Sequence, residues 1–163
     1  MGAIVTEPAY HVELIGGIEI QKPLPKKFHA IVQARLIVAL SKWQEANGIT
    51  CEVLPELDVL CGRNREDRLI PDITVAPESA HYIDGQLADA ALLCVEIMSP
   101  GQTIGSLFDK CDRIHLGGTE VCWVVWPERK RCWMYLSNGE LAETTVLRFQ
   151  ACSIDTEALF RGM

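Results

Sequence analysis

The fold is decided by two apolar runs, Leu69-Ile-Pro-Asp-Ile-Thr-Val-Ala76 and Leu92-Leu-Cys-Val-Glu-Ile-Met-Ser-Pro100. Both runs are rich in side chains that favour strands, and each carries one carboxylate near its middle. An ionised carboxylate in apolar surroundings is costly unless a metal ion or a cationic group neutralises it. Two such strands side by side would hold Asp72 and Glu96 at one place, so this pair is the candidate centre of a functional site.

The segment before these runs predicts a hairpin followed by a helix. Gly16-Gly17 predicts a tight turn between strands at residues 10–15 and 18–20, because glycine accepts positive φ. Gln21–Lys27, with two prolines, is expected to form a loop. Apolar residues at helical spacing predict a helix from about residue 28 to residue 46.

The remaining segments predict further strands and a second helix. One β segment is expected at residues 51–60, a loop at 77–90 and a helix at 103–115 that Gly117-Gly118 ends. Later elements are expected as strands at 121–126, 131–136 and 144–149, and as a short helix at 154–160 capped by Asp155. This order predicts an α/β or mixed α+β fold: one mixed sheet flanked by helices, with an N-terminal β-hairpin, in a single domain spanning residues 1–163.

The composition is that of a water-soluble globular protein, with 48% hydrophobic and 23% charged residues. The seven cysteines are an odd number without a CxxC pair, so we expect reduced thiols and a cytoplasmic location. No apolar run has the length of a membrane span, and Met1–Ala9 lacks the features of a signal peptide. The net charge of −7 weighs against binding DNA through bulk electrostatics, but it permits an enzyme with a local basic patch and a bound metal.

Lys110 is the third member of the candidate site. It lies between Leu107 and Ile114 at the border of the apolar stripe of the second predicted helix. Two acids on strands and a lysine on the following helix fit metal-dependent phosphodiester cleavage, in which carboxylates hold Mg²⁺ or Mn²⁺ and the lysine assists the attacking water. Each residue also has a structural interpretation: Asp72 as a turn or edge residue, Glu96 as the buried partner of an arginine, and Lys110 as a solvated lysine.

These motifs, in their order, resemble the Uma2 family of restriction endonucleases within the PD-(D/E)XK nuclease superfamily. The resemblance rests on Pro71-Asp-Ile-Thr-Val75, Val95-Glu-Ile-Met-Ser-Pro100, Lys110 and Trp123-Val-Val-Trp-Pro127, together with the opening Tyr10-His-Val-Glu13 and Phe28-His29. It implies a restriction-endonuclease-like core and Mg²⁺-dependent (or Mn²⁺-dependent) hydrolysis of nucleic acid, with DNA as the expected substrate. Hydrolysis of a smaller phosphodiester is a further alternative.

The resemblance also implies roles for individual residues. Asp72 and Glu96 match the metal-binding acids, and Ile97 is expected as a further metal ligand. The superfamily lysine, two positions after the second acid, is Met98 here, so its role would pass to Lys110. His29 matches a histidine that contacts phosphate or relays a proton, and a core or capping role is its alternative. Glu13 matches an auxiliary acid.

Basic clusters are the candidate contacts to nucleic acid. The first choice is the turn before the Asp72 run, with Arg63, Arg65 and Arg68; a second cluster comprises Lys22, Lys26 and Lys27. Such charge runs are more often solvated surface. Glu56 and Asp58, which alternate with apolar residues, are expected on the solvated face of a strand.

Two departures from the family pattern favour an alternative function, that of a catalytically inactive nuclease-fold module for binding or assembly. Ile114 replaces a tyrosine one turn after the lysine, and Trp126 replaces an aspartate. Trp126 and Trp133 are also candidates for a homodimer interface, with a place in the core as the alternative.

Overall fold

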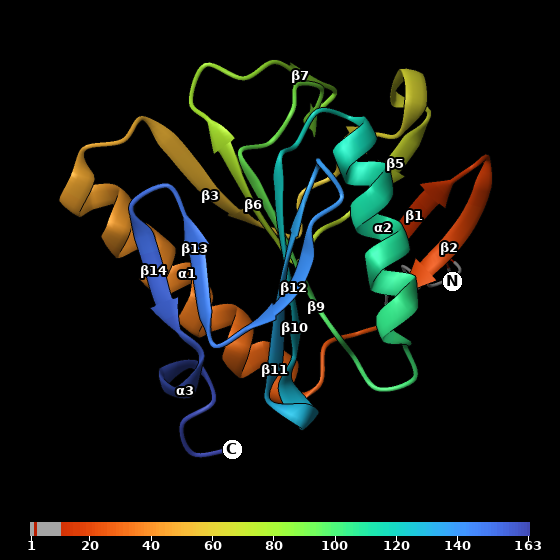
Figure 1. Cartoon of the computed structure of the whole chain (residues 1–163). Helices are drawn as coiled ribbons and strands as arrows, with labels where there is room; N and C mark the ends of the chain where they lie inside the picture. Colours follow the sequence, from red (N-terminus) through yellow and green to blue (C-terminus); the bar gives the residue numbers. More distant parts are fainter. Residues whose placement is uncertain (1, 3–10) are drawn as a thin grey trace.

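A computed structural model of the chain describes residue 2 and residues 11–163 (Figure 1). Tyr10 and, apart from Gly2, the segment Met1–Ala9 lie outside the described residues. The predicted hairpin is confirmed: β1 (His11–Ile15) pairs antiparallel with β2 (Ile18–Lys22). Gly16 and Gly17 have φ values of +56° and +79°, as the tight turn requires. The predicted loop begins too early, because β2 continues through Gln21 and Lys22.

The predicted helices are confirmed, although the last one begins after the predicted residue 154 because Ile154 and Asp155 belong to a strand. Helix α1 (Lys27–Asn47) buries an apolar stripe and ends at Gly48, which has the left-handed φ of 59°. Helix α2 (Ile104–Leu116) begins after Thr103, whose hydroxyl accepts a hydrogen bond from the Ser106 N–H at 3.2 Å. The short helix α3 (Thr156–Leu159) begins after Asp155, whose carboxylate accepts from the Glu157 N–H at 2.8 Å.

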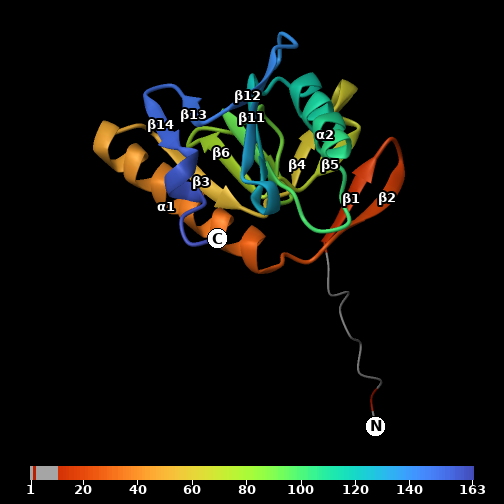
Figure 2. The same cartoon turned by 60° about the horizontal axis from the view of Figure 1, so that its bottom comes forward.

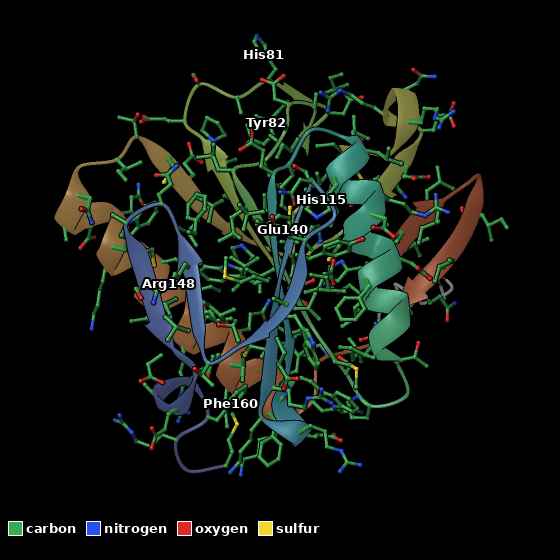
Figure 3. The ribbon with its side chains drawn as sticks, viewed as in Figure 1. His81, Tyr82, His115, Glu140, Arg148 and Phe160 are labelled. Atoms are coloured by element: carbon green, nitrogen blue, oxygen red, sulfur yellow. The ribbon has the colours of Figure 1, made fainter. Side chains whose placement is uncertain are left out.

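A central mixed sheet has the strand order β12-β11-β10-β9-β6-β3, in which β9 and β10 run parallel and the other neighbours antiparallel. Its strands are β3 (Cys51–Pro55), β6 (Ile73–Pro77), β9 (Leu93–Ile97), β10 (Val121–Trp126), β11 (Arg131–Leu136) and β12 (Leu141–Thr144). Helices α1 and α2 lie on opposite sides of it (Figure 1), and side chains fill the space between the layers (Figure 3).

The two faces of the central sheet bury different residues of the same strands. Val95 and Ile97 pack with α1 residues in one apolar cluster, whereas Cys94 packs with α2 residues in the other. Because side chains alternate along a strand, Glu96 faces the same side as Cys94, toward α2. This alternation brings Glu96 to the helix that carries Lys110.

A second mixed sheet has the order β2-β1-β5-β4-β8-β7, and β13 pairs with β14 in a third. The added strands are β4 (Val59–Cys61), β5 (Asp67–Leu69), β7 (Tyr82–Ile83), β8 (Gln86–Leu87), β13 (Val146–Phe149) and β14 (Cys152–Asp155), with short 3-10 turns at η1 (Arg63–Arg65) and η2 (Pro127–Arg129). The predicted mixed class, with helices flanking a mixed sheet, is confirmed. The strands are nevertheless divided among more sheets than the one expected.

Four local predictions are wrong. The expected strand at residues 51–60 is broken at Glu56, which has a φ of +51°, so β3 and β4 belong to different sheets. The expected loop at residues 77–90 contains the small β7–β8 hairpin, and the expected strand at 144–149 is interrupted between β12 and β13. Asp72 lies just before β6, where the chain passes from one sheet to the other, rather than in the middle of a strand.

The tryptophans proposed for a dimer interface are largely interior. Trp133 is buried with the cluster that faces α2, and Trp126 is half-buried against the same cluster. A core role is therefore confirmed for Trp133, and a homodimer stays a prediction.

Within residues 11–163, no helix is long and apolar enough to cross a membrane.

All seven cysteines are buried and free, so the native protein is expected to react very slowly with Ellman's reagent at pH 8. Burial raises the pKa of Cys61 and of Cys132 to about 12, which removes the reactive thiolate. In guanidinium chloride, all seven thiols should react within the mixing time of the assay. Fast reaction of several thiols in the folded protein would contradict the buried positions.

Candidate functional site

The two acids singled out in the sequence lie side by side. Strands β6 and β9 pair antiparallel with Ile73 opposite Val95, and continuing this register by one residue places Asp72 opposite Glu96. Both carboxylates are only 1% exposed. The junction before β6 and the end of β9 thus bring the two acidic residues to neighbouring positions, and Glu96 faces α2.

Lys110 of α2 joins Glu96 to an acid from the N-terminal hairpin. Its Nζ lies 3.0 Å from Glu96 Oε2 and 3.0 Å from Glu13 Oε1, and Glu13 Oε2 accepts a hydrogen bond from the Ile70 N–H at 3.0 Å. Burial opposes the charge on Lys110, but Glu96 and Glu13 outweigh it and hold the pKa of this lysine above its ordinary value. The hairpin stands beside α2 (Figure 2).

One oxygen of Asp72 accepts a hydrogen bond, and the other has only ion-pair contacts. Its Oδ2 accepts the Ile97 N–H at 2.6 Å, and its Oδ1 lies 2.7 Å from Lys22 Nζ and 3.0 Å from Nε2 of His29, near the start of α1. Burial opposes ionisation of Asp72. The contact with His29 and the charge of Lys22 outweigh it, so the pKa of Asp72 lies below its ordinary value and the carboxylate is ionised.

Lys22 and Glu56 belong to this network although the sequence did not predict it. Lys22 Nζ also contacts Glu56 Oε2 at 2.9 Å and the Ile70 carbonyl oxygen at 2.6 Å. Glu56, expected on a solvated strand face, is half-buried and accepts a hydrogen bond from Gln33 Nε2 at 2.9 Å. The sequence carried a weak signal for the burial of Lys22. If the strand is extended beyond Ile20, Lys22 lies on the same face as Ile20, because side chains two residues apart share a face. The sequence carried no such signal for Glu56, because its half-buried position follows from a turn in which its own φ is positive.

The arginines predicted to contact nucleic acid lie outside this network. Arg63 and Arg65 are exposed on η1, and the Gly62 N–H just before it donates to the Arg113 carbonyl of α2 at 2.8 Å. Arg68 is half-buried in β5, with Nη2 3.5 Å from the Val12 carbonyl oxygen. Their contact with nucleic acid stays a prediction.

A cleft of about 670 Å³ opens onto the network between the β1–β2 hairpin and the start of α2. Glu13 and Lys110 line it from the network. The rest of the lining combines apolar and polar side chains, among them Ile20, Pro100, Gln102, Thr103 and Ser106. A smaller hollow of about 180 Å³ reaches His29 and also touches Pro100. The cleft thus reaches Glu13 and Lys110, and the hollow reaches His29, whereas Asp72 and Glu96 line neither of these two spaces.

The donor set fits a hard divalent cation. Glu96 Oε1 is buried and has no hydrogen-bond partner, and burial raises the pKa of Glu96 to about 7 despite the charge of Lys110. Mg²⁺ and Mn²⁺ prefer carboxylate oxygens and keep several waters, so two acids suffice. No three acidic, histidine or cysteine side chains of the described chain are arranged as a metal site. Ile97, predicted as a metal ligand, has an apolar side chain and could contact a cation only through its main chain. Its N–H donates a hydrogen bond to Asp72.

Comparisons with known proteins give a family model and a structural match. The Uma2 model, described as "Putative restriction endonuclease", matches residues 3–162. A crystal structure described as a "putative nuclease belonging to DUF820" from Anabaena variabilis has a TM-score of 0.80 and 20% sequence identity, over 96% of this chain and 93% of that chain. At this identity the match shows a shared fold alone. No curated protein matches the chain.

Proposed function

The chain belongs to the Uma2 family, and from that premise we propose that it is a Mg²⁺- or Mn²⁺-dependent endonuclease that hydrolyses phosphodiester bonds of DNA. One observation supports this proposal above the others. Asp72, Glu96 and Lys110 come from three different elements and meet in one buried network beside an open cleft, and Glu96 keeps an unpartnered oxygen there.

Asp72 and Glu96 are the proposed holders of the cation. Such a cation, when bound, acidifies a water molecule and withdraws negative charge from the scissile phosphate. The Ile97 N–H and His29 fix the orientation of Asp72 through the contacts at 2.6 Å and 3.0 Å. In this arrangement His29 is a positioning residue for an acid.

Lys110 supplies the positive charge for the transition state. Lys110 lines the cleft, and Glu13 and Glu96 hold its ammonium group in place, so it can stabilise the negative charge that develops on the phosphate oxygens. Glu13 thereby acts as an auxiliary acid that positions the lysine. The attacking water and the phosphate would enter through the cleft between β2 and the start of α2.

Plasmid cleavage tests this function. Wild-type protein is expected to nick supercoiled DNA with Mg²⁺ or Mn²⁺ and to stop in excess EDTA. Asp72→Ala and Lys110→Ala should each lower the rate at least about 100-fold. Glu45→Ala and Lys42→Ala, which remove the same charge types from exposed positions of α1, are the matched controls. Equal activity in wild type, Asp72→Ala and Lys110→Ala would contradict the assignment, and circular dichroism checks that each variant is folded.

A second candidate function is that of a nuclease-fold module that binds without cutting. The observation in its favour is that Asp72 Oδ2 already accepts the Ile97 N–H and that Lys22 and His29 lie within 3.0 Å of Oδ1. Calorimetric titration with Mn²⁺ separates the two functions. Submillimolar binding that is lost in Glu96→Ala would argue against an inactive site.

A further inference from the structure

Lys22 is enclosed by oxygen atoms. Its Nζ lies 2.6 Å from the Ile70 carbonyl, 2.7 Å from Asp72 Oδ1 and 2.9 Å from Glu56 Oε2, and the residue is only 6% exposed. The ammonium group donates hydrogen bonds to the Ile70 carbonyl and to Glu56 Oε2, and it forms an ion pair with Asp72 Oδ1. Lys22 therefore fills a small oxygen cradle at the end of β2.

The two proposed metal ligands differ in their availability because of this lysine. Lys110 binds Glu96 through Oε2 alone and leaves Oε1 without a partner, so it does not block this acid. Asp72 Oδ1 likewise accepts no hydrogen bond, but the Lys22 ammonium lies 2.7 Å from it as an ion pair, and the Ile97 N–H takes the other oxygen. A divalent cation bound to Asp72 Oδ1 would lie close to the Lys22 ammonium, and like charges repel strongly where water is largely excluded.

We propose that Lys22 is a tethered cation that neutralises Asp72 in the metal-free protein, and that a divalent cation binds by displacing the Lys22 ammonium from Asp72. This inference rests on the proposed cation site at Asp72 and Glu96. It adds an exchange of one positive charge for another at that site.

Glu56 is the acidic partner that the Lys22 ammonium keeps after it is displaced from Asp72. Its Oε1 is held by Gln33 Nε2 at 2.9 Å, while its Oε2 already contacts Lys22. The displaced ammonium can keep Glu56 and the Ile70 carbonyl as partners, so it need not be left buried without an acid. An anchored acid beside the cradle thus makes the exchange physically feasible.

Titration calorimetry of EDTA-treated protein with Mn²⁺ tests the exchange. Lys22→Gln should bind Mn²⁺ at least about tenfold more tightly than wild type, because the competing charge is gone. Lys26→Gln, which removes an exposed lysine from the same segment, should change the affinity by no more than about twofold. Glu56→Gln should weaken binding, because the displaced ammonium then has no acidic partner.

Each outcome decides a different point. Unchanged or weaker Mn²⁺ binding by Lys22→Gln would overturn the exchange and leave the proposed cation site intact. If Lys22→Gln does not fold, unchanged or tighter binding by Glu56→Gln overturns it. Absence of Mn²⁺ binding in both wild type and Lys22→Gln would overturn the cation site as well. Tighter binding by Lys22→Gln without plasmid cleavage by any form would support the exchange and contradict the nuclease function.

Discussion

Replacing Lys110 by methionine is expected to lower the free energy of unfolding by about 3–5 kcal/mol. The substitution removes the only cation within 3.0 Å of both Glu96 and Glu13 among the contacts of the described residues, and both acids are almost fully buried. Methionine fills similar space but leaves their charges uncompensated. Urea denaturation followed by circular dichroism measures the loss, which corresponds to a lower melting temperature by roughly 6–20 °C.

Two further variants separate charge from packing. Lys42→Met, on the exposed face of α1, should change stability by no more than about 0.5 kcal/mol. Adding Glu96→Gln to Lys110→Met should recover part of the loss, because one of the two buried negative charges is removed. If Lys110→Met is as stable as wild type, its ion pairs make no net contribution to folding.

The metal-free protein is expected to lose about 3 kcal/mol of Glu96-dependent stability between pH 4.5 and pH 7. Burial raises the pKa of Glu96 from 4.5 to about 7, against the opposing effect of Lys110. In this window the folded state keeps a proton on Glu96 that the unfolded state has released. Stability from this group therefore falls as pH rises, and its full penalty is present above pH 7.

Comparison of wild type with Glu96→Gln isolates this effect. Denaturation in EDTA at several pH values should give a stability that declines with pH in wild type and a flatter profile in Glu96→Gln. Glu45→Gln, an exposed acid of α1, should keep the wild-type slope. Parallel profiles for wild type and Glu96→Gln would show that Glu96 titrates alike in the folded and unfolded states. Asp72, whose pKa is lowered, acts oppositely, and its contribution is lost only as the pH falls below 3.8.

Local sequence patterns determined much of the secondary structure. Gly16-Gly17 required a tight turn, the apolar stripes required two long helices, and the strands at 121–126 and 131–136 have their predicted bounds. These features depend on neighbours a few residues apart, which a single sequence displays directly. The meeting of Glu96 with Lys110 followed from the same periods, since a strand face and a helix stripe point in known directions.

Only the tertiary structure decided how the charges are paired. Lys22 and Glu56 lie 34 residues apart, and the sequence carries only a weak signal for burial of Lys22 and none for Glu56. Their burial depends on the positive φ of Glu56, which sends β3 and β4 into different sheets, and on the hairpin that carries Lys22 to Asp72. A charged residue becomes part of a buried site only when an opposite charge from elsewhere in the chain compensates it, and local periodicity does not contain that information.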